Sequence, residues 1–154
     1  MIANQTFDSV SVLIAEDDDG HAELIQDLLV EVGVRNPIQR FRDGQEVLDF
    51  LRGKSGNPSF RREGAYLLLL DIRMPRVDGV EVLRQIKSDD SLKRIPVIML
   101  TTTDDPREIQ SCYQLGCNCY VTKPIEFDQF ASVLRNLGLF LLIVKVPDIR
   151  DDKA

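Results

Sequence analysis

The sequence lacks several features that define specialised classes of protein. Its apolar runs are far shorter than the ~20 consecutive residues of a membrane-spanning helix, so we expect no membrane partner. It lacks a positively charged start followed by an apolar run, so we expect no secretory signal. Basic residues are in the minority, with 19 Lys and Arg against 25 Asp and Glu. The formal net charge of -6 argues against nucleic acid as the main partner.

Cysteine is also scarce. Cys112, Cys117 and Cys119 are an odd number and lack the spacing of metal ligands. We therefore expect small buried thiols in a reduced, cytoplasmic protein. A chain of 154 residues, 44% of them hydrophobic and without an internal repeat or linker, suits one domain with a sizeable core. We assign this domain to residues 8–142 and a C-terminal tail to residues 143–154, which is too short for an effector domain.

Short apolar strands alternate with amphipathic helices along the chain. Strands are predicted over Ser11–Ala15, Ile38–Phe41, Tyr66–Leu70, Pro96–Leu100 and Cys119–Thr122. Helices are predicted over Gly20–Val32, after Asp43, over Val80–Lys87, from Pro106 to about Leu115, and over Glu126–Leu142. Continuous apolar strands are typical of a parallel sheet that is covered on both faces. We predict an α/β fold with a five-stranded parallel sheet in the flavodoxin-like order 2-1-3-4-5 and helices on both faces.

Polar residues follow four of these strands at the point where each strand ends. Glu16 and Asp17 follow the first strand, and Asp71 follows the third. Thr101 follows the fourth strand and Lys123 the fifth. The carboxyl ends of parallel strands share one edge of the sheet, so these side chains should converge. Clustered carboxylates favour a hard divalent cation such as Mg²⁺. A carboxylate nucleophile, a metal, a lysine and a hydroxyl are the parts that phosphoryl chemistry needs.

This set resembles the receiver domain of two-component response regulators, the CheY-like family. The matching features are Glu16-Asp17, Asp71-x-x-Met-Pro75-x-x-Asp78-Gly79, Thr101 and Lys123-Pro124, in that order. The resemblance covers about Val10 to Leu137, which is most of the chain.

The resemblance implies that Asp71 accepts a phosphoryl group from the phosphohistidine of a sensor histidine kinase. Asp17 and Asp71 would bind Mg²⁺ directly, and Glu16 would act through water. The backbone carbonyl of Arg73 would complete the protein ligands. The chain would not be an enzyme beyond this self-catalysed transfer and a slow autodephosphorylation.

The resemblance also implies a conformational switch. Thr101 would move toward the phosphoryl group, Lys123 would pair with it, and Tyr120 would be the aromatic residue that turns inward on activation. Asp18 and Asp19 fall past the motif, and we expect them to begin the first helix as caps. The single histidine, His21, is expected at the exposed start of that helix without a chemical role.

Three other functions fit parts of the pattern. A Mg²⁺-dependent phosphatase of the haloacid-dehalogenase type needs a second Asp two positions after the nucleophile, where this chain has Arg73. A flavodoxin must cradle a phosphate in its first loop, which is acidic here and would repel it. A pseudo-receiver that binds partners without phosphorylation would not need the full set of acids with Thr101 and Lys123.

Loops and tail resemble a narrower group, the stand-alone regulators that pair with bacterial and cyanobacterial phytochromes. The features concerned are the long loop Gly53–Gly64, the extension Leu139–Ile149, Leu-Thr-Thr-Thr103, Asp-Pro106 and Cys119–Lys123. This resemblance implies a phytochrome-type sensor histidine kinase as the partner.

The segment Leu137–Val144 is almost wholly apolar, so one face toward the sheet cannot bury all of it. The phytochrome-linked regulators tend to pair through helix four, strand five, helix five and the tail. We therefore expect a two-fold homodimer that buries Phe140, Leu141, Ile143 and Val144. The alternative is a monomer whose tail folds back over its own domain.

Overall fold

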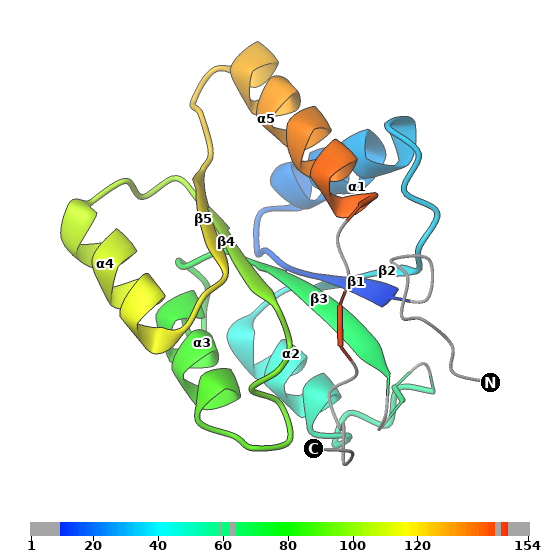
Figure 1. The fold of residues 1–154 in the computed structure, drawn as a ribbon, viewed down its shortest axis with the longest axis vertical. Coiled ribbons are helices and arrows are strands. Elements are labelled where there is room, and N and C mark those ends of the chain that lie inside the picture. The colour runs from blue at the N-terminus through cyan, green and yellow to red at the C-terminus, as the bar shows by residue number, and fades with distance from the viewer. Residues whose placement is uncertain (1–9, 59, 62–63, 144–145, 148–154) are drawn as a thin grey trace.

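Strands and helices alternate along the chain in the computed structural model, which describes residues 10–58, 60–61, 64–143 and 146–147 (Figure 1). The strands are β1 (Val10–Ala15), β2 (Ile38–Phe41), β3 (Ala65–Leu70), β4 (Val97–Thr101) and β5 (Cys119–Thr122). The helices are α1 (Asp19–Glu31), α2 (Gly44–Leu51), α3 (Gly79–Lys87), α4 (Pro106–Leu115) and α5 (Phe127–Leu141). All strand pairs are parallel, in the order β2-β1-β3-β4-β5. The predicted fold is confirmed.

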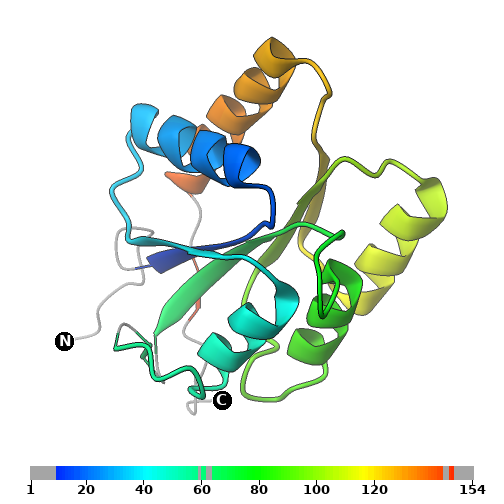
Figure 2. The same cartoon turned by 180° about the vertical axis from the view of Figure 1, so that it is seen from behind.

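The helices form one layer on each face of the sheet. Helices α1 and α5 lie side by side on one face, and α2, α3 and α4 cover the other (Figures 1 and 2). Successive strand residues point to opposite faces. In β1, Leu13 packs with Phe50 on the α2–α4 side, and Ile14 packs with Leu134 on the α1–α5 side. Every residue of β3 is buried, as its continuous apolar run predicted.

Four aspartates begin the helices that follow β1 to β4. The side chains of Asp18, Asp43 and Asp78 each accept a hydrogen bond of 2.9 Å from the backbone N–H three residues later. Asp105 accepts a 2.9 Å bond from the backbone N–H of Arg107. These caps satisfy amides that a helix start leaves without intrahelical partners. They also fix the loops at the carboxyl edge of the sheet, where the predicted site lies.

The loop between β3 and α3 folds back tightly under Asp71. The backbone N–H of Gly79 donates to the carbonyl of Ile72 at 2.7 Å. A Cβ atom on Gly79 would lie 2.0 Å from the backbone oxygen of Asp71, so only glycine fits. This close approach fixes the backbone that carries the Asp71 carboxylate.

The C-terminal segment is divided between core and surface. Leu141 has 0% exposure and packs in the core, so its expected place in a dimer interface is wrong. Val144 lies outside the described residues. Val146, with 1% exposure, also packs against the α1–α5 side of the core. Four apolar residues at the end of α5 and just after it remain exposed, and together we call them the α5 patch: Leu139, Phe140, Leu142 and Ile143.

The loop after α2 is anchored by aromatic contacts. The rings of Phe60 and Tyr66 stack with centroids 6.5 Å apart, and Phe50 meets both rings edge-on. The Tyr66 hydroxyl accepts a 2.7 Å hydrogen bond from the backbone N–H of Arg61. No helix in the described part of the chain is long and apolar enough to cross a membrane.

Candidate functional site

Three carboxylates meet at the carboxyl ends of β1 and β3. These strands are neighbours, and Ala15 pairs with Leu70, so the residues that follow them lie side by side. Glu16, Asp17 and Asp71 each offer an oxygen within 4.8 Å of the others. Glu16 is 2% exposed and Asp71 is 9% exposed, whereas Asp17 faces solvent. The structure thus brings together the three acids that the sequence singled out.

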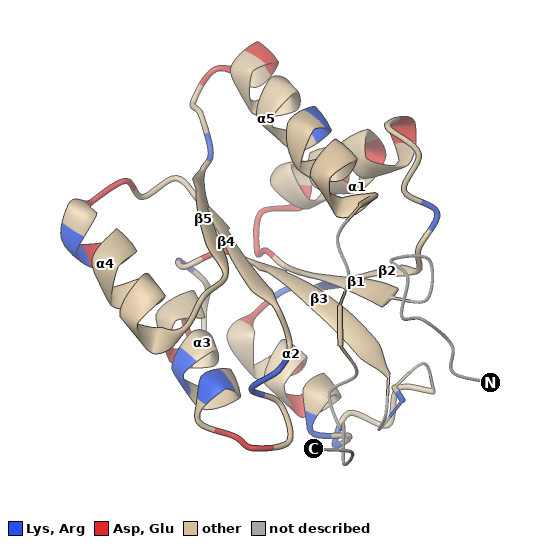
Figure 3. Cartoon of the chain, viewed as in Figure 1, with Lys and Arg blue, Asp and Glu red and all other residues tan. Residues whose placement is uncertain are grey.

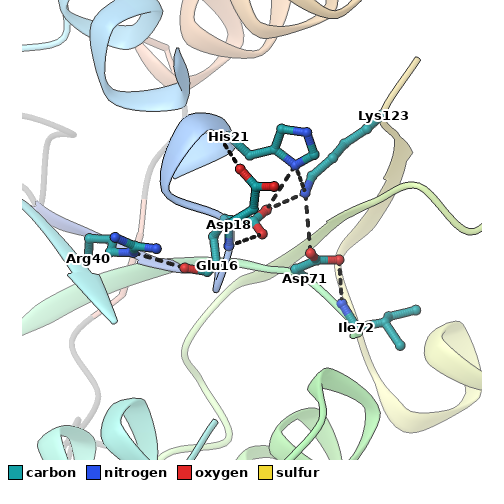
Figure 4. A network of polar contacts seen from close by, with 7 residues as sticks. All are labelled: Glu16, Asp18, His21, Arg40, Asp71, Ile72 and Lys123. Carbon is teal, nitrogen blue, oxygen red and sulfur yellow. Dashed lines mark hydrogen bonds and ion pairs between the residues drawn. The ribbon is translucent and has the colours of Figure 1, made fainter. Parts of the chain in front are cut away.

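Lys123 reaches this cluster from the end of β5. Its side chain is 1% exposed, and its ammonium contacts the Glu16 carboxylate and lies 3.2 Å from Asp71 Oδ2 (Figure 4). The backbone N–H of Lys123 donates to the carbonyl of Thr101 at 2.7 Å, which holds the start of this loop against β4. A buried ammonium needs such partners, because desolvation of an unpaired charge is costly.

One lysine does not neutralise the cluster. Burial raises the pKa of Glu16 to about 7, although Lys123 lowers it through its charge and hydrogen bond, and the negative Asp71 raises it further. The donors are all oxygen atoms, and one of the three acids is open to solvent. Such a donor set fits a hard divalent cation.

A cavity of about 460 Å³ opens beside the cluster. It is lined by Asp17, Ile72, Arg73, Met74, Asp78, Val80 and Glu108. The predicted backbone ligand Arg73 therefore lies in the same cavity as the exposed acid Asp17. A metal ion or a small phosphodonor could reach the carboxylates from this side.

Thr101 is the last residue of β4, and Tyr120 lies within the neighbouring strand β5, paired with Met99. The Thr101 side chain is fully buried, and its hydroxyl has no hydrogen-bond partner among the described residues. An unpaired buried hydroxyl is costly, which marks it as a group available to a ligand atom. The Tyr120 hydroxyl donates to the carbonyl of Thr103 at 2.7 Å, and burial raises its pKa. Tyr120 thus links β5 to the loop that follows Thr101.

The family model for the response regulator receiver domain matches residues 12–135. The chain belongs to this family. A curated relative of this receiver, Response regulator Rcp1 of Synechocystis, is 32% identical over 131 residues, which cover 85% of this chain and 88% of Rcp1.

Solved structures agree with this assignment. A receiver domain from Rhodospirillum rubrum has a TM-score of 0.82 and 44% identity, covering 90% of this chain and 97% of its own. The phosphorylated cyanobacterial phytochrome response regulator RcpA has a TM-score of 0.76 and 36% identity, with 86% and 93% covered. The Mn²⁺-bound form of Rcp1 has a TM-score of 0.81 and 31% identity, with 89% and 98% covered.

Two residues of the receiver differ from expectation at the start of α1. Asp18 is the predicted cap, but Asp19 is the first residue of the helix and pairs instead with Arg40 and Arg42 at 2.7 Å each. His21 was expected to have no role, yet its Nδ1 lies 3.2 Å from Lys123 Nζ (Figure 4). A sequence signal existed for His21, because the first turn of α1 rises from the same edge of the sheet as the acids.

Proposed function

We propose that this receiver is the phosphorylatable switch of a two-component system. The Asp71 carboxylate attacks the phosphorus of a kinase phosphohistidine, a P–O bond forms, and the P–N bond breaks to release the imidazole. The observation that carries this proposal is the position of Asp71, beside two further carboxylates and within 3.2 Å of a buried ammonium. Charge on the transferred group needs cationic partners, and this constellation offers them.

The site residues have separate roles in binding the metal ion and the phosphoryl group. Asp17 and Asp71 would hold Mg²⁺ directly, Glu16 would hold it through water, and the carbonyl of Arg73 would complete the protein ligands. When bound, the ion neutralises charge on the carboxylates and on the phosphoryl oxygens. The name of the Mn²⁺-bound Rcp1 structure supports a divalent metal in a relative. Lys123 pairs with a phosphoryl oxygen.

The switch uses Thr101 at the end of β4 and Tyr120 within β5. The unpaired Thr101 hydroxyl donates to the phosphoryl group, which draws the end of β4 toward Asp71. Tyr120 is bonded to the carbonyl of Thr103, so it follows when the loop after Thr101 moves. The receiver signals through this change and is not an enzyme beyond its own phosphorylation and slow dephosphorylation. The three free cysteines fit a cytoplasmic location for this function.

Intact mass after incubation with acetyl phosphate and Mg²⁺ tests the proposal. Wild type should gain one phosphoryl group, and chelation of Mg²⁺ with EDTA should prevent the gain. Asp71→Asn should gain none, because an amide cannot attack. Asp105→Asn, a change at a helix cap on the same edge of the sheet, is the matched control and should label like wild type. Equal labelling of wild type and Asp71→Asn, or none in wild type, would refute the proposal.

We further propose a phytochrome-type kinase as the partner. The phosphorylated relative RcpA is named as a cyanobacterial phytochrome response regulator, and it covers 86% of this chain at 36% identity. Phosphotransfer from a panel of purified kinases tests this pairing. A phytochrome kinase should phosphorylate Asp71 faster than the other kinases and differently in its two light states. Faster transfer from an unrelated kinase would contradict the pairing.

The oligomeric proposal is a homodimer through α4, β5, α5 and the tail. The α5 patch supports it, because these four side chains are apolar and exposed and no charged residue follows Arg135 in α5 (Figure 3). A second copy of the same chain covers such a patch when a two-fold axis passes beside it.

A further inference from the structure

The ammonium of Lys123 has three N–H donors, and three side-chain groups lie around it. Two of them are the carboxylates of Glu16 and Asp71, the second at 3.2 Å. The third is the imidazole Nδ1 of His21, also at 3.2 Å. Figure 4 shows the ammonium between these three groups. His21 is thus the one group of the three that is not a carboxylate.

Both the backbone and the ring of His21 have defined contacts. Its backbone N–H donates to the Asp18 carboxylate at 2.9 Å, which fixes the residue in the first turn of α1. Its ring meets Phe130 of α5 edge-on, with centroids 5.6 Å apart and planes at 83°. The side chain is 38% exposed, and its Nδ1 lies 3.9 Å from Glu16 Oε1 and 3.2 Å from Lys123 Nζ. The ring therefore presents Nδ1 to the buried end of Lys123.

Lys123 needs an acceptor because its four-carbon side chain is flexible. Glu16 and Asp71 compete for the ammonium, and in the proposed function both also take part in holding a cation. His21 has no such second task. It can keep the ammonium beside Asp71 while the carboxylates exchange partners.

We infer that His21 is a positioning residue for the phosphorylation of Asp71, whose Nδ1 accepts one ammonium proton of Lys123 and keeps that ammonium aimed at the incoming phosphoryl group. This inference rests on the proposed function. It requires the neutral imidazole to carry its proton on Nε2, so that the lone pair of Nδ1 faces Lys123.

Two substitutions of His21 distinguish the effect of the hydrogen-bond acceptor from the effect of the aromatic ring. His21→Phe keeps an aromatic ring against Phe130 and removes the acceptor. His21→Asn loses the ring but places an amide oxygen at the position of Nδ1. With acetyl phosphate and Mg²⁺, His21→Phe should phosphorylate about tenfold more slowly than wild type, the lower end of the loss typical for groups that orient a ligand. His21→Asn should recover most of the rate.

The phosphorylation rates of the two variants show whether His21 positions Lys123 or only packs against Phe130. If His21 only packed against Phe130, His21→Phe would keep the wild-type rate and His21→Asn would lose it, and that result would overturn the inference. Equal rates in all three proteins would overturn it as well. Thermal unfolding of both variants is measured in parallel, so that each rate is compared at a temperature where the protein is folded.

A readout without phosphorylation separates this inference from the proposed function. His21 is the only histidine of the chain, so its imidazole signals in a long-range ¹H–¹⁵N spectrum need no assignment. At mildly alkaline pH we expect the Nε2–H tautomer with Nδ1 accepting. An Nδ1–H tautomer would make His21 a donor toward Glu16 and would overturn the inference, even if Asp71 is phosphorylated normally.

Discussion

Glu16 is a carboxylate buried between a lysine and a second carboxylate. Burial raises its pKa from the ordinary value of 4.5 to about 7, despite the opposing effect of Lys123. A group whose pKa is higher in the folded state favours folding when it is protonated. Its contribution to stability is complete below pH 4.5 and is lost as the pH rises through about 7.

Urea unfolding at a series of pH values checks this consequence. In EDTA, the free energy of unfolding of wild type should fall between pH 4.5 and about pH 7 relative to that of Glu16→Gln, because the glutamine has no proton to lose. With excess Mg²⁺, the free energy of unfolding of wild type should no longer fall with pH relative to that of Glu16→Gln, because metal binding needs the deprotonated acid. Parallel pH profiles in EDTA would show that Glu16 does not titrate in this range.

Arg73 and Thr103 stand two positions after Asp71 and Thr101, and the resemblance to the receiver family implies that these two positions tune the lifetime of the phosphoryl group. Neither is an acid or an amide that could orient an attacking water well. We predict a phosphoryl group that persists for minutes or longer, and a shorter lifetime in Thr103→Glu, where a carboxylate can act as a base. Phosphate release after removal of the phosphodonor measures both. A wild-type half-life of seconds is the contrary result.

The sequence predicted site residues that lie directly after strands. Glu16, Asp71 and Lys123 each follow a strand, and strand order alone brings them to one edge. His21 was missed because its contact with Lys123 joins residues 102 positions apart through the rotation of α1 against β5. The pairing of Asp19 with Arg40 depends in the same way on the register of β1 and β2, which periodicity does not reveal.

At the scale of elements, the approach of α3 to the end of β3 fixes the backbone of Asp71. A Cβ on Gly79 would lie 2.0 Å from the Asp71 carbonyl oxygen and 2.8 Å from the Ile72 Cα. Gly79→Ala must therefore move backbone, and we expect a loss of about 1–3 kcal/mol or more in the free energy of unfolding.

Gly20→Ala is the matched control for this element. A Cβ on Gly20 lies near a single side-chain atom, Asp18 Oδ1, at 3.2 Å. Alanine favours a helix over glycine, so the free energy of unfolding should stay within about 1 kcal/mol of wild type. Urea denaturation of both variants gives the comparison. Equal stability of the two variants would show that the loop after β3 adapts to a side chain.

Helix ends were predictable because their signals are local. Asp105 and Pro106 begin α4, and Gly116 ends it in the left-handed region with φ of 110°, as the residue types indicate. Strand β4 begins at Val97 and extends to Thr101, one residue later at each end than expected. Which residues of the C-terminal segment are buried was not predictable from the sequence. The buried residues Leu141 and Val146 are as apolar as the exposed residues Phe140 and Ile143, and only tertiary packing distinguishes them.

At the scale of the whole molecule, the α5 patch predicts self-association. Phe140 is 51% exposed and Ile143 is 77% exposed, so both can be changed to Glu without opening the core. Truncation after Gly138 would be less specific, because it also removes the core residue Leu141. Lys54→Glu, in the exposed loop after α2 and outside α4, β5 and α5, is the control for added negative charge.

Light scattering at tens of micromolar gives the masses. Wild type and Lys54→Glu should be close to twice 17.5 kDa, and the Phe140→Glu, Ile143→Glu double variant should be close to 17.5 kDa, because charges in an apolar interface are not paired. A wild-type mass near 17.5 kDa would contradict the dimer, as would a dimeric double variant.

The central claim is that one carboxylate of this receiver, Asp71, carries the phosphoryl group. Reduction with borohydride converts an aspartyl phosphate to homoserine, which marks the residue in a peptide map. After incubation with acetyl phosphate and Mg²⁺, we predict homoserine at position 71 and unchanged aspartate at positions 17 and 78. Homoserine at another position, or none in a protein whose intact mass has increased, would contradict the account.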